Sequence, residues 1–228
     1  MSAMPEAAAL PDLAGRLPLL PERRSAGAHV ADLAARGTTI RQERLSGIHN
    51  PWGLADAITD PWAFLDLCES APVVATAQSL LGPDILLWDS ELYLDGAHYC
   101  SFLREDREGR YWPATPLAGA VILVAFEDRE TAIEAIDIAA IGRGTVPQLA
   151  ARGAGRPLYV IRVMPATSHY DRDPRSPANR CCMEEQVLIN YTNRPLWLLA
   201  GENRGGSDLV RGFSMTVPVW IEAVAPAA

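Results

Sequence analysis

The apolar run AGAVILVAF at 118–126 limits the possible folds of this chain more than any other stretch. A continuous apolar run of this length is typical of a strand that is covered on both faces. The earlier stretch ILLWDSELYL at 85–94 alternates in part, as a strand with two different faces does. We expect Leu87, Asp89, Glu91 and Tyr93 on one face of it and Trp88, Ser90, Leu92 and Leu94 on the other.

Further patterns predict helices before these strands and more strands after them. Asp60 before Pro61 is a good helix start, and the helix that follows in APVVATAQSLLGP should stop at Gly82 and Pro83. The apolar spacing of ETAIEAIDIAAIGRG at 130–144 predicts an amphipathic helix. Three more strands are expected, in RPLYVIRVMPA at 156–166, EQVLINYT at 185–192 and GFSMTVPVWIEA at 212–223.

Short helices followed by many short strands indicate a mainly β fold with flanking helices, an all-β sandwich or a jelly roll. The 228 residues suffice for one domain with a real core. Residues 1–25 are rich in Ala, Pro and Arg and are expected to be a flexible N-terminal segment. Residues 26–228 then form the single domain, with an insertion at about 127–157.

Charge and composition exclude several classes of function. A net charge of −8 argues against a nucleic-acid partner, which requires a basic face. No apolar run reaches the roughly 18–20 residues of a membrane span, and the first residues do not resemble a secretion signal. All 20 basic residues are arginine, which excludes Schiff-base and P-loop chemistry on a lysine. We therefore expect a cytoplasmic protein with no membrane and no nucleic-acid partner.

Four stretches, taken in order, resemble the phytanoyl-CoA dioxygenase family of Fe(II)/2-oxoglutarate oxygenases. They cover about residues 60–222 and are LLGPDILLWDSELYL at 80–94, DREGRYWPATP at 106–116, VMPATSH at 163–169 and, more weakly, LLAGEN at 198–203. Each motif alone is weak, whereas the ordered set is fairly specific. The resemblance implies a double-stranded β-helix, a cupin-like jelly roll with an open-mouthed pocket.

The residues that would hold iron in that family are replaced. The family binds iron with two histidines and a carboxylate. By the resemblance, the first histidine falls on Asp106, the carboxylate on Glu108, and the second histidine at or next to Leu198. The last of the four histidines is His169, so no histidine is available on a late strand. His169 itself is expected to be a structural turn residue. We therefore expect no metal.

The 2-oxoglutarate site is altered as well. Arg211 has the position of the family's late arginine, but Asp89 and Glu91 would repel a dianion from the early strand. Arg211 could instead bind a carboxylate or enolate of a substrate. No cofactor is expected, and the expected partner is a small-molecule substrate. The sequence leaves a monomer and a homodimer open.

The remaining polar residues are the candidates for catalysis and binding. Asp106 and Glu108 are two apart, so on an extended segment they face the same way, although a solvated charge run is the alternative. Glu91 and Tyr93 lie mid-strand among apolar neighbours, so they either form a structural ion pair with Arg162 or Arg211 or act on a substrate. The expected catalytic residues are Glu91, Tyr93, Asp106, Glu108 and Arg211. The expected substrate-binding residues, for several of which core packing is the alternative, are Asp89, Tyr111, Trp112, Tyr191, Asn193 and Trp197.

These observations predict a cofactor-free enzyme of specialised metabolism. It would catalyse a redox-neutral cyclisation, isomerisation or elimination of a mostly apolar intermediate, because a shaped cavity with placed acid–base groups can do this without a redox centre. Two alternatives remain open. One is a non-catalytic protein that binds a ligand or a partner in the same shell, and the other is an oxygenase with atypical metal ligands.

Overall fold

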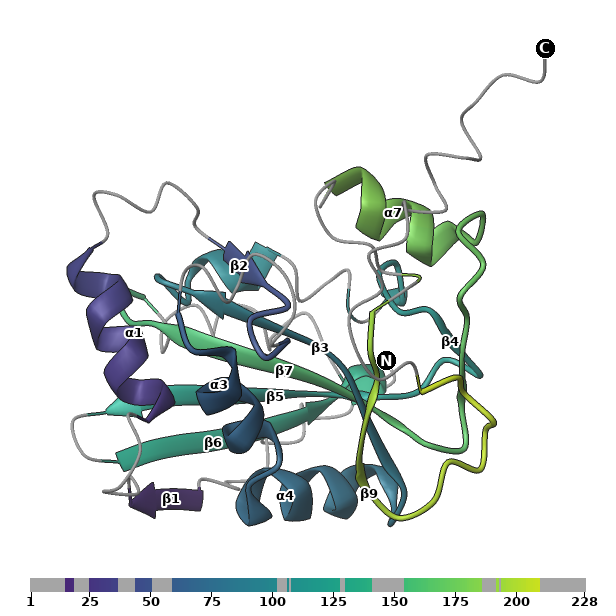
Figure 1. Cartoon of the computed structure of the whole chain (residues 1–228), viewed down its shortest axis with the longest axis horizontal. Coiled ribbons are helices and arrows are strands. Elements are labelled where there is room, and N and C mark those ends of the chain that lie inside the picture. Colours follow the sequence, from purple (N-terminus) through teal and green to yellow (C-terminus); the bar gives the residue numbers. More distant parts are fainter. Residues whose placement is uncertain are drawn as a thin grey trace, which may run out of the picture.

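A seven-stranded antiparallel β-sheet forms the centre of the structure (Figure 1). Its strand order is β1–β6–β5–β7–β3–β2, and β9 pairs with the other end of β3. Strands β4 and β8 form a separate two-stranded sheet. The computed structural model describes residues 15–18, 25–36, 44–50, 59–101, 106, 108–127, 130–140, 154–185, 192 and 194–209. The fold is mainly β with flanking helices, as the sequence predicts.

Short helices and strands follow one another along the chain, with most of the described helices before β3. The strands are β1 (Gly15–Pro18), β2 (Arg44–Ser46), β3 (Ile85–Tyr93), β4 (Ala114–Thr115), β5 (Ala120–Glu127), β6 (Glu130–Asp137), β7 (Leu158–Pro165), β8 (His169–Tyr170) and β9 (Trp197–Ala200). The helices are α1 (Ala26–Ala35), α3 (Pro61–Cys68), α4 (Ala71–Leu81) and α7 (Pro177–Glu185), with 3₁₀ turns at His98–Ser101 and Ile138–Ala140.

The helix boundaries predicted around residue 60 and residue 82 are confirmed. The Asp60 carboxylate caps α3 by accepting a hydrogen bond from the backbone N–H of Trp62, and Pro61 is the first helical residue. Helix α4 ends at Gly82, whose φ of 91° is favourable for glycine because it has no Cβ.

The main sheet has two buried faces with different coverings. Helices α1, α3 and α4 pack on one face, over the cluster that contains Leu87, Leu92 and Tyr159. On the other face, strands β4 and β8 and helix α7 cover a second cluster that contains Trp88, Tyr93 and Val160. The continuous apolar run in β5 follows from this arrangement, because side chains from Ala120 to Val124 are buried on both faces.

A β-bulge in β3 changes the predicted alternation of that strand. The register with β7 shifts between Leu87 and Asp89, so Trp88 is an extra residue in the ladder. Trp88 therefore joins the same cluster as Tyr93, whereas Leu87 packs on the helix-covered face with Leu92. The predicted alternation is right after the bulge and wrong for Leu87 and Trp88, because simple alternation assumes an unbroken ladder.

The helix predicted at 130–144 is wrong for the part that the structure describes. Residues Glu130–Asp137 form β6, which pairs with β5 along its whole length, and a 3₁₀ turn follows at Ile138–Ala140. Ile133 is buried on the helix-covered face and Ile136 on the opposite face. A strand buried on both faces permits this three-residue spacing of apolar side chains, so the spacing did not identify a helix.

Several predicted segments fall outside the described residues. The strand expected at 212–223 lies there entirely, and so do residues 186–191 of the strand expected at 185–192. Within the N-terminal segment expected to be flexible, Gly15–Pro18 pair with β6 as an edge strand. None of the helices in the described part of the chain combines the length and apolar character that crossing a bilayer requires.

The turn after β9 is held by Asp84. The Asp84 carboxylate accepts hydrogen bonds from the backbone N–H of Glu202 (2.8 Å) and from Nε of Arg204 (2.7 Å). Gly201 lies against Asp84 with a φ of 70°, and a Cβ there would collide with the Asp84 carboxylate and come within 2.8 Å of its Cα. This close approach requires glycine at position 201.

Substituting Gly201→Ala is expected to lower the free energy of unfolding by about 1–3 kcal/mol, through backbone strain and the clash with Asp84. Urea denaturation measures the loss. Gly206→Ala is the matched control, because Gly206 has a similar φ of 65° but an added Cβ would meet no atom of the described residues within 4 Å. Equal losses for the two variants would show that strain alone acts and that the contact with Asp84 is unimportant.

Candidate active site

Arg162 is the centre of a buried network of charged side chains between β3 and β7. The register of the two strands places Arg162 opposite Asp89, and Glu91 lies two residues further along the same face of β3. The Arg162 guanidinium contacts Asp89 Oδ2 (3.3 Å), Glu91 Oε2 (2.8 Å) and Asp106 Oδ1 (2.9 Å). We call Arg162 and these three carboxylates the Arg162 network.

Glu91 has partners on both carboxylate oxygens. Oε2 accepts a hydrogen bond from the Tyr93 hydroxyl (2.6 Å) in addition to its contact with Arg162. Oε1 accepts a hydrogen bond from the Ser46 hydroxyl (2.9 Å) and lies 3.7 Å from the Arg44 guanidinium, both of which come from β2. The sequence offered Arg162 or Arg211 as the partner that a mid-strand carboxylate requires, and the structure places Arg162 there.

Asp106 reaches the same network from outside the main sheet. Its side chain is fully buried. Oδ1 accepts hydrogen bonds from Arg162 Nε (2.9 Å) and Trp112 Nε1 (2.9 Å), and Oδ2 accepts one from the Tyr99 hydroxyl (2.7 Å). Charge-assisted hydrogen bonds of this kind hold a buried carboxylate in one orientation.

Asp89 contacts a second buried arginine, Arg194. The Arg194 Nη1 lies 2.7 Å from Asp89 Oδ1 and donates to the backbone carbonyl of Trp88 at 2.7 Å. The guanidinium carbon of Arg194 also lies 5.8 Å from the centre of the Trp88 ring, a cation–π distance. Asp89 is thus held between two guanidinium groups, Arg162 and Arg194.

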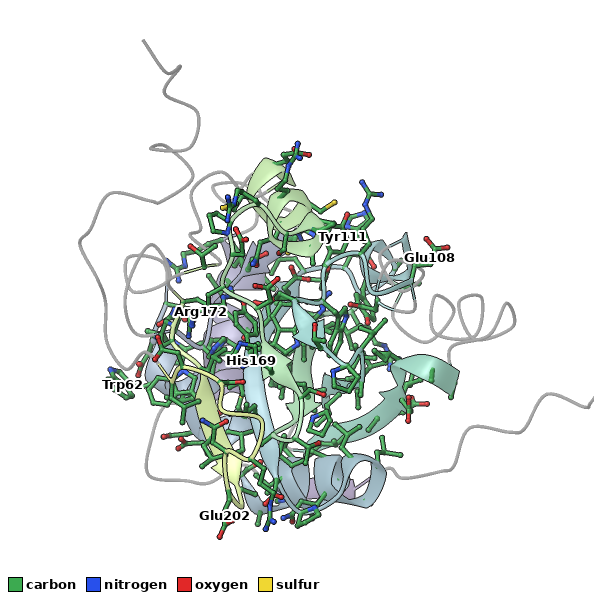
Figure 2. All side chains as sticks on the ribbon, turned by 90° about the vertical axis from the view of Figure 1, so that its right-hand side faces the viewer. Trp62, Glu108, Tyr111, His169, Arg172 and Glu202 are labelled. Atoms are coloured by element: carbon green, nitrogen blue, oxygen red, sulfur yellow. The ribbon has the colours of Figure 1, made fainter. Side chains whose placement is uncertain are left out.

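Arg172 holds the backbone on which Arg194 lies. Its Nη1 donates to the carbonyls of Thr192 (2.6 Å) and Arg194 (2.9 Å), and its Nη2 donates to the carbonyl of Asp208 (2.6 Å). The same guanidinium stacks over the ring of Tyr170 at 5.3 Å, and Figure 2 shows Arg172 close to the strand that carries His169. Arg172 therefore acts on the network through Arg194 and contacts no carboxylate of it in the interactions described above.

Asp89 and Glu91 have pKa values that are shifted in opposite directions. Burial raises the pKa of Asp89 and the neighbouring Glu91 charge adds to this effect, and together they outweigh Arg194 and Arg162, which lower it. Burial also acts to raise the pKa of Glu91, but Arg162 and Arg44 outweigh it and lower this pKa to about 2. One strand face therefore carries a carboxyl that holds its proton more tightly than usual and one that stays ionised.

The low pKa of Glu91 predicts a loss of stability in acid. A carboxyl whose pKa falls on folding stabilises the protein above its unfolded pKa, and this contribution disappears as the pH falls through the folded pKa. For Glu91 the window runs from 4.5, its usual pKa, down to about 2. The difference of about 2.5 pKa units corresponds to roughly 3 kcal/mol. The raised pKa of Asp89 acts with the opposite sign, since its contribution is lost as the pH rises.

Urea denaturation at a series of acidic pH values tests this for wild type and Glu91→Gln. We expect the free energy of unfolding of the wild type to fall more steeply with decreasing pH than that of Glu91→Gln. Glu184→Gln is the matched control, because it makes the same chemical change at an exposed position of α7. A wild-type slope no steeper than that of Glu91→Gln would contradict the assignment.

The structure separates Glu108 from Asp106. Residues 106 and 108 belong to a helical turn, not to an extended segment, so side chains two apart point in different directions. Asp106 is buried in the network, and the Glu108 carboxylate lies exposed at the outer edge of the molecule (Figure 2). The prediction that both face the same way is wrong, and Glu108 is not in the Arg162 network.

The other expected site residues divide into three groups. Trp112 and Tyr111 are buried on the network side of the sheet, and Trp112 bonds directly to Asp106. Trp197 instead packs on the helix-covered face, because odd positions of β9 point there while Leu198 points to the network side. The prediction that Trp197 lies in the same cavity as the other site residues is therefore wrong. Arg211, Tyr191 and Asn193 lie outside the described residues.

Four residues that contact the Arg162 network are not among those expected from the sequence, namely Arg44, Ser46, Tyr99 and Arg194. Tyr99 lies in a 3₁₀ turn with no periodic pattern, so nothing in the sequence places it beside Asp106. Arg194 precedes the apolar stretch of β9, where a basic residue is easily taken for a solvated one. Arg162 carried a clearer signal, since it is the one charge within the apolar strand LYVIRVMP.

The residues at the expected iron positions do not fit an iron site. Both oxygens of Asp106 are occupied by donors of the protein, Glu108 is exposed, and Leu198 offers no donor atom. The Arg162 guanidinium lies among the carboxylates, where its charge opposes a second cation. Within the described residues, no three His, Cys, Asp or Glu side chains are placed to hold a metal ion. His169 is exposed in β8, with Nδ1 3.2 Å from the carbonyl of Gly205.

Comparison with known proteins adds no relative to this description. No protein-family model matches the chain, and no curated protein matches it significantly.

Proposed function

We propose that this chain is a metal-independent enzyme that carries out a redox-neutral cyclisation, isomerisation or elimination on a mostly apolar small molecule. It would do so on a jelly-roll scaffold similar to that of the phytanoyl-CoA dioxygenases, in the specialised metabolism of the cytoplasm. The antiparallel sheet with a second small sheet over one face supports the scaffold. The four ordered motifs of the sequence support the family.

One observation carries the proposed chemistry, the opposite pKa shifts of Asp89 and Glu91 on one strand face. Groups whose environments push their pKa values apart are suited to act as acid and base or as acid and electrostatic partner. In this scheme Asp89 gives a proton to the substrate. Glu91 remains ionised, and its charge stabilises positive charge that develops on the substrate.

The product of such a reaction has the oxidation state of the substrate. In an isomerisation or cyclisation, Asp89 donates a proton to one atom, and the carboxylate so formed takes up the proton that another atom loses, so Asp89 is restored and no electron acceptor is consumed. Arg162 and Arg194 supply fixed positive charge beside Asp89. These cations are part of the protein, and the network therefore keeps its electrostatic field without a bound ion.

The aromatic residues beside the network favour an apolar substrate. The rings of Trp88 and Trp112 lie 5.1 Å apart in an edge-to-face arrangement, and Tyr170 lies 6.2 Å from Trp88. Aromatic side chains at such distances form a rigid wall that packs against apolar groups. A wall of this kind restricts the conformers of a flexible substrate, which accelerates ring closure.

A second candidate is a non-catalytic protein that binds a ligand or a partner. One observation favours it, namely that five of the six oxygens of Asp89, Glu91 and Asp106 accept hydrogen bonds in the protein, and that the sixth, Asp89 Oδ1, lies 2.7 Å from Arg194 Nη1. A buried network with partners at this density can fix a unique packing of the core without any chemistry. The two functions differ in whether the protein converts a substrate at all. Only the enzyme requires the Asp89 proton for turnover.

Comparison of metabolites from producing cells with and without the gene tests the proposal. We expect an intermediate to accumulate in the deletion strain, and purified protein should convert it in the presence of a chelator to a product with no change in oxidation state. A product that is an isomer of the intermediate, or that differs from it by the loss of one water molecule, fits the proposal. Addition of oxygen atoms to the product, or a requirement for 2-oxoglutarate, would overturn it. No accumulation at all would favour the non-catalytic function.

A further inference from the structure

A short segment at the edge of the main sheet carries a buried histidine against β3. The segment, residues 44–50, contains β2, the last strand at one end of the sheet, and the turn that follows it. His49 in this turn is 1% exposed, and its Nδ1 lies 2.7 Å from the Ser90 hydroxyl. Its Nε2 has no hydrogen-bond partner among the described residues. We call residues 44–50 the β2 segment.

The β2 segment is attached to β3 by a small number of contacts. Its backbone pairs with β3 over only three residues, and the N–H of Gly47 donates to the Ser90 carbonyl at 2.7 Å. Ser46 and Arg44 contact the Glu91 carboxylate, as described above. Short edge elements of this kind open at a lower free energy than the centre of a sheet. The β2 segment can therefore open while the rest of the sheet stays folded.

The groups that reach His49 through Ser90 are uncharged at neutral pH. Tyr159 of β7 is hydrogen-bonded to Ser90, and its hydroxyl lies 3.2 Å from Cys68 Sγ of α3. Burial raises the pKa of Cys68 to about 12 and holds that of Tyr159 well above its usual value. Neither group supplies a negative charge that would stabilise a protonated His49.

The charge that acts on His49 is the positive charge of Arg194. Asp89 and Glu91 flank Ser90 along β3, but they point to the opposite face of the sheet, where arginines hold them. The surroundings of the imidazole therefore favour its neutral form.

Protonation of His49 in the closed segment is unfavourable for two reasons. A protonated imidazole donates from both nitrogens, whereas Nε2 finds no acceptor among the described residues, and the Arg194 charge repels it. Burial and then Arg194 lower the pKa of His49 from its usual value of 6.5 to about 3. In an open segment the ring is in water and regains the usual value. The closed state therefore loses stability relative to the open state as the pH falls from 6.5 towards 3.

We propose that the β2 segment is an acid-sensitive latch, in which protonation of His49 releases the segment from Ser90 and Glu91 and opens this edge of the Arg162 network to solvent. The released segment takes Arg44 and Ser46 away from the Glu91 carboxylate. The latch is a regulatory device of the fold, and it operates whether or not the network catalyses a reaction.

The two pKa values of His49 set the size of the effect. Between pH 7 and pH 5, the ratio of open to closed segments should rise about 25-fold. Glu91 contributes little over this range, because its usual pKa is 4.5 and its pKa in the closed structure is about 2. A change between pH 7 and pH 5 therefore reports on His49 and not on Glu91.

Amide hydrogen exchange followed by NMR at pH 7, 6 and 5 tests the latch, with rates corrected for the intrinsic pH dependence of exchange. The N–H of Gly47 reports opening of the segment, and Ile161, paired with β3 and β5 at the centre of the sheet, reports global unfolding. We expect Gly47 to exchange faster than Ile161 and to respond little to low concentrations of urea, because local opening exposes little surface. Its protection should fall about 25-fold from pH 7 to pH 5.

His49→Gln removes the titrating ring and keeps a side chain that can bond to Ser90, so the protection of Gly47 should become independent of pH over this range. His49→Asn replaces it if His49→Gln fails to fold. His98→Gln is the matched control, because His98 is exposed in a 3₁₀ turn, and it should retain the 25-fold fall. The other buried histidine, His29, faces Asp60 and is unchanged in all these variants.

Protection of Gly47 equal to that of Ile161, with the same urea dependence, would overturn the latch, because the segment would then open only with the whole sheet. Local exchange of Gly47 that does not change between pH 7 and pH 5 would also overturn it, as would the same pH dependence in His49→Gln. The proposed function fails separately, through a product that has gained oxygen or through full turnover without the Asp89 proton.

Discussion

Replacing Arg162 by methionine is expected to lower the free energy of unfolding by about 3–5 kcal/mol. Methionine keeps much of the length and apolar volume of the arginine stem but removes the charge. Asp89, Glu91 and Asp106 would then share a buried space without the cation that contacts all three. Burial acts to lower the pKa of Arg162, but these carboxylates outweigh it and hold the pKa well above its usual value, a sign of how strongly they favour the charged form.

Urea denaturation of Arg162→Met measures this effect, and the same substitution at Arg175 is the matched control. Arg175 pairs with Asp173 at the surface, where ion pairs contribute little, so Arg175→Met should unfold at the same urea concentration as the wild type. The deficit of Arg162→Met should shrink as the pH is lowered, because the stranded carboxylates take up protons. Adding Asp106→Asn should make the double variant less destabilised than the sum of the single changes. Unfolding of Arg162→Met at the wild-type midpoint would show that the network does not depend on its arginine.

The second large effect is expected at Asp89. Asp89→Asn keeps the shape of the side chain and removes the proton, so turnover of the accumulated intermediate should fall about a hundred- to ten-thousandfold, as for loss of a general acid. Initial rates with purified protein measure this loss. The folded state should persist, because the amide oxygen still accepts from Arg162 or Arg194.

Asp173→Asn is the control for turnover, since it makes the same chemical change at an exposed position. It should leave the rate unchanged. The raised pKa of Asp89 also predicts a limb in the pH–rate profile, with the rate falling as the pH rises through that pKa and the acid loses its proton. Full turnover in Asp89→Asn would show that Asp89 is not the acid, and that the reaction is accelerated by the shape of the site alone or by other residues.

Much of the fold could be predicted from the sequence. Strong local signals gave correct elements, since the caps at Asp60 and Gly82 fix the boundaries of α3 and α4, and the apolar run at 118–126 is the buried strand β5. The segment at 130–137 was misassigned as a helix, because its isoleucine spacing suits a helix and a doubly buried strand equally well. Pairing with β5 on one side and β1 on the other made it a strand.

The candidate site was predicted in part. Period-two alternation correctly put Asp89, Glu91 and Tyr93 on one face, and the cost of burying a charge correctly required a cationic partner for Glu91. Glu108 and Trp197 were misplaced, because Asp106 and Glu108 both have helical backbone and because β9 turns Trp197 to the helix-covered face. Tyr99 and Arg194 carried no local signal.

Local preferences in the sequence are enough to define strands and helices where those preferences are strong, and the cost of a buried charge requires an arginine partner for an acid in the strand at 85–94. Which arginine becomes that partner depends on tertiary pairing. Arg162 and Asp89 are 73 residues apart and become neighbours through the register of β3 with β7. The same register contains the bulge that brings Trp88 and Asp89 to one face. Contacts across a sheet depend on pairing between distant strands, and a single inserted residue changes the face of every side chain before it, which no local pattern encodes.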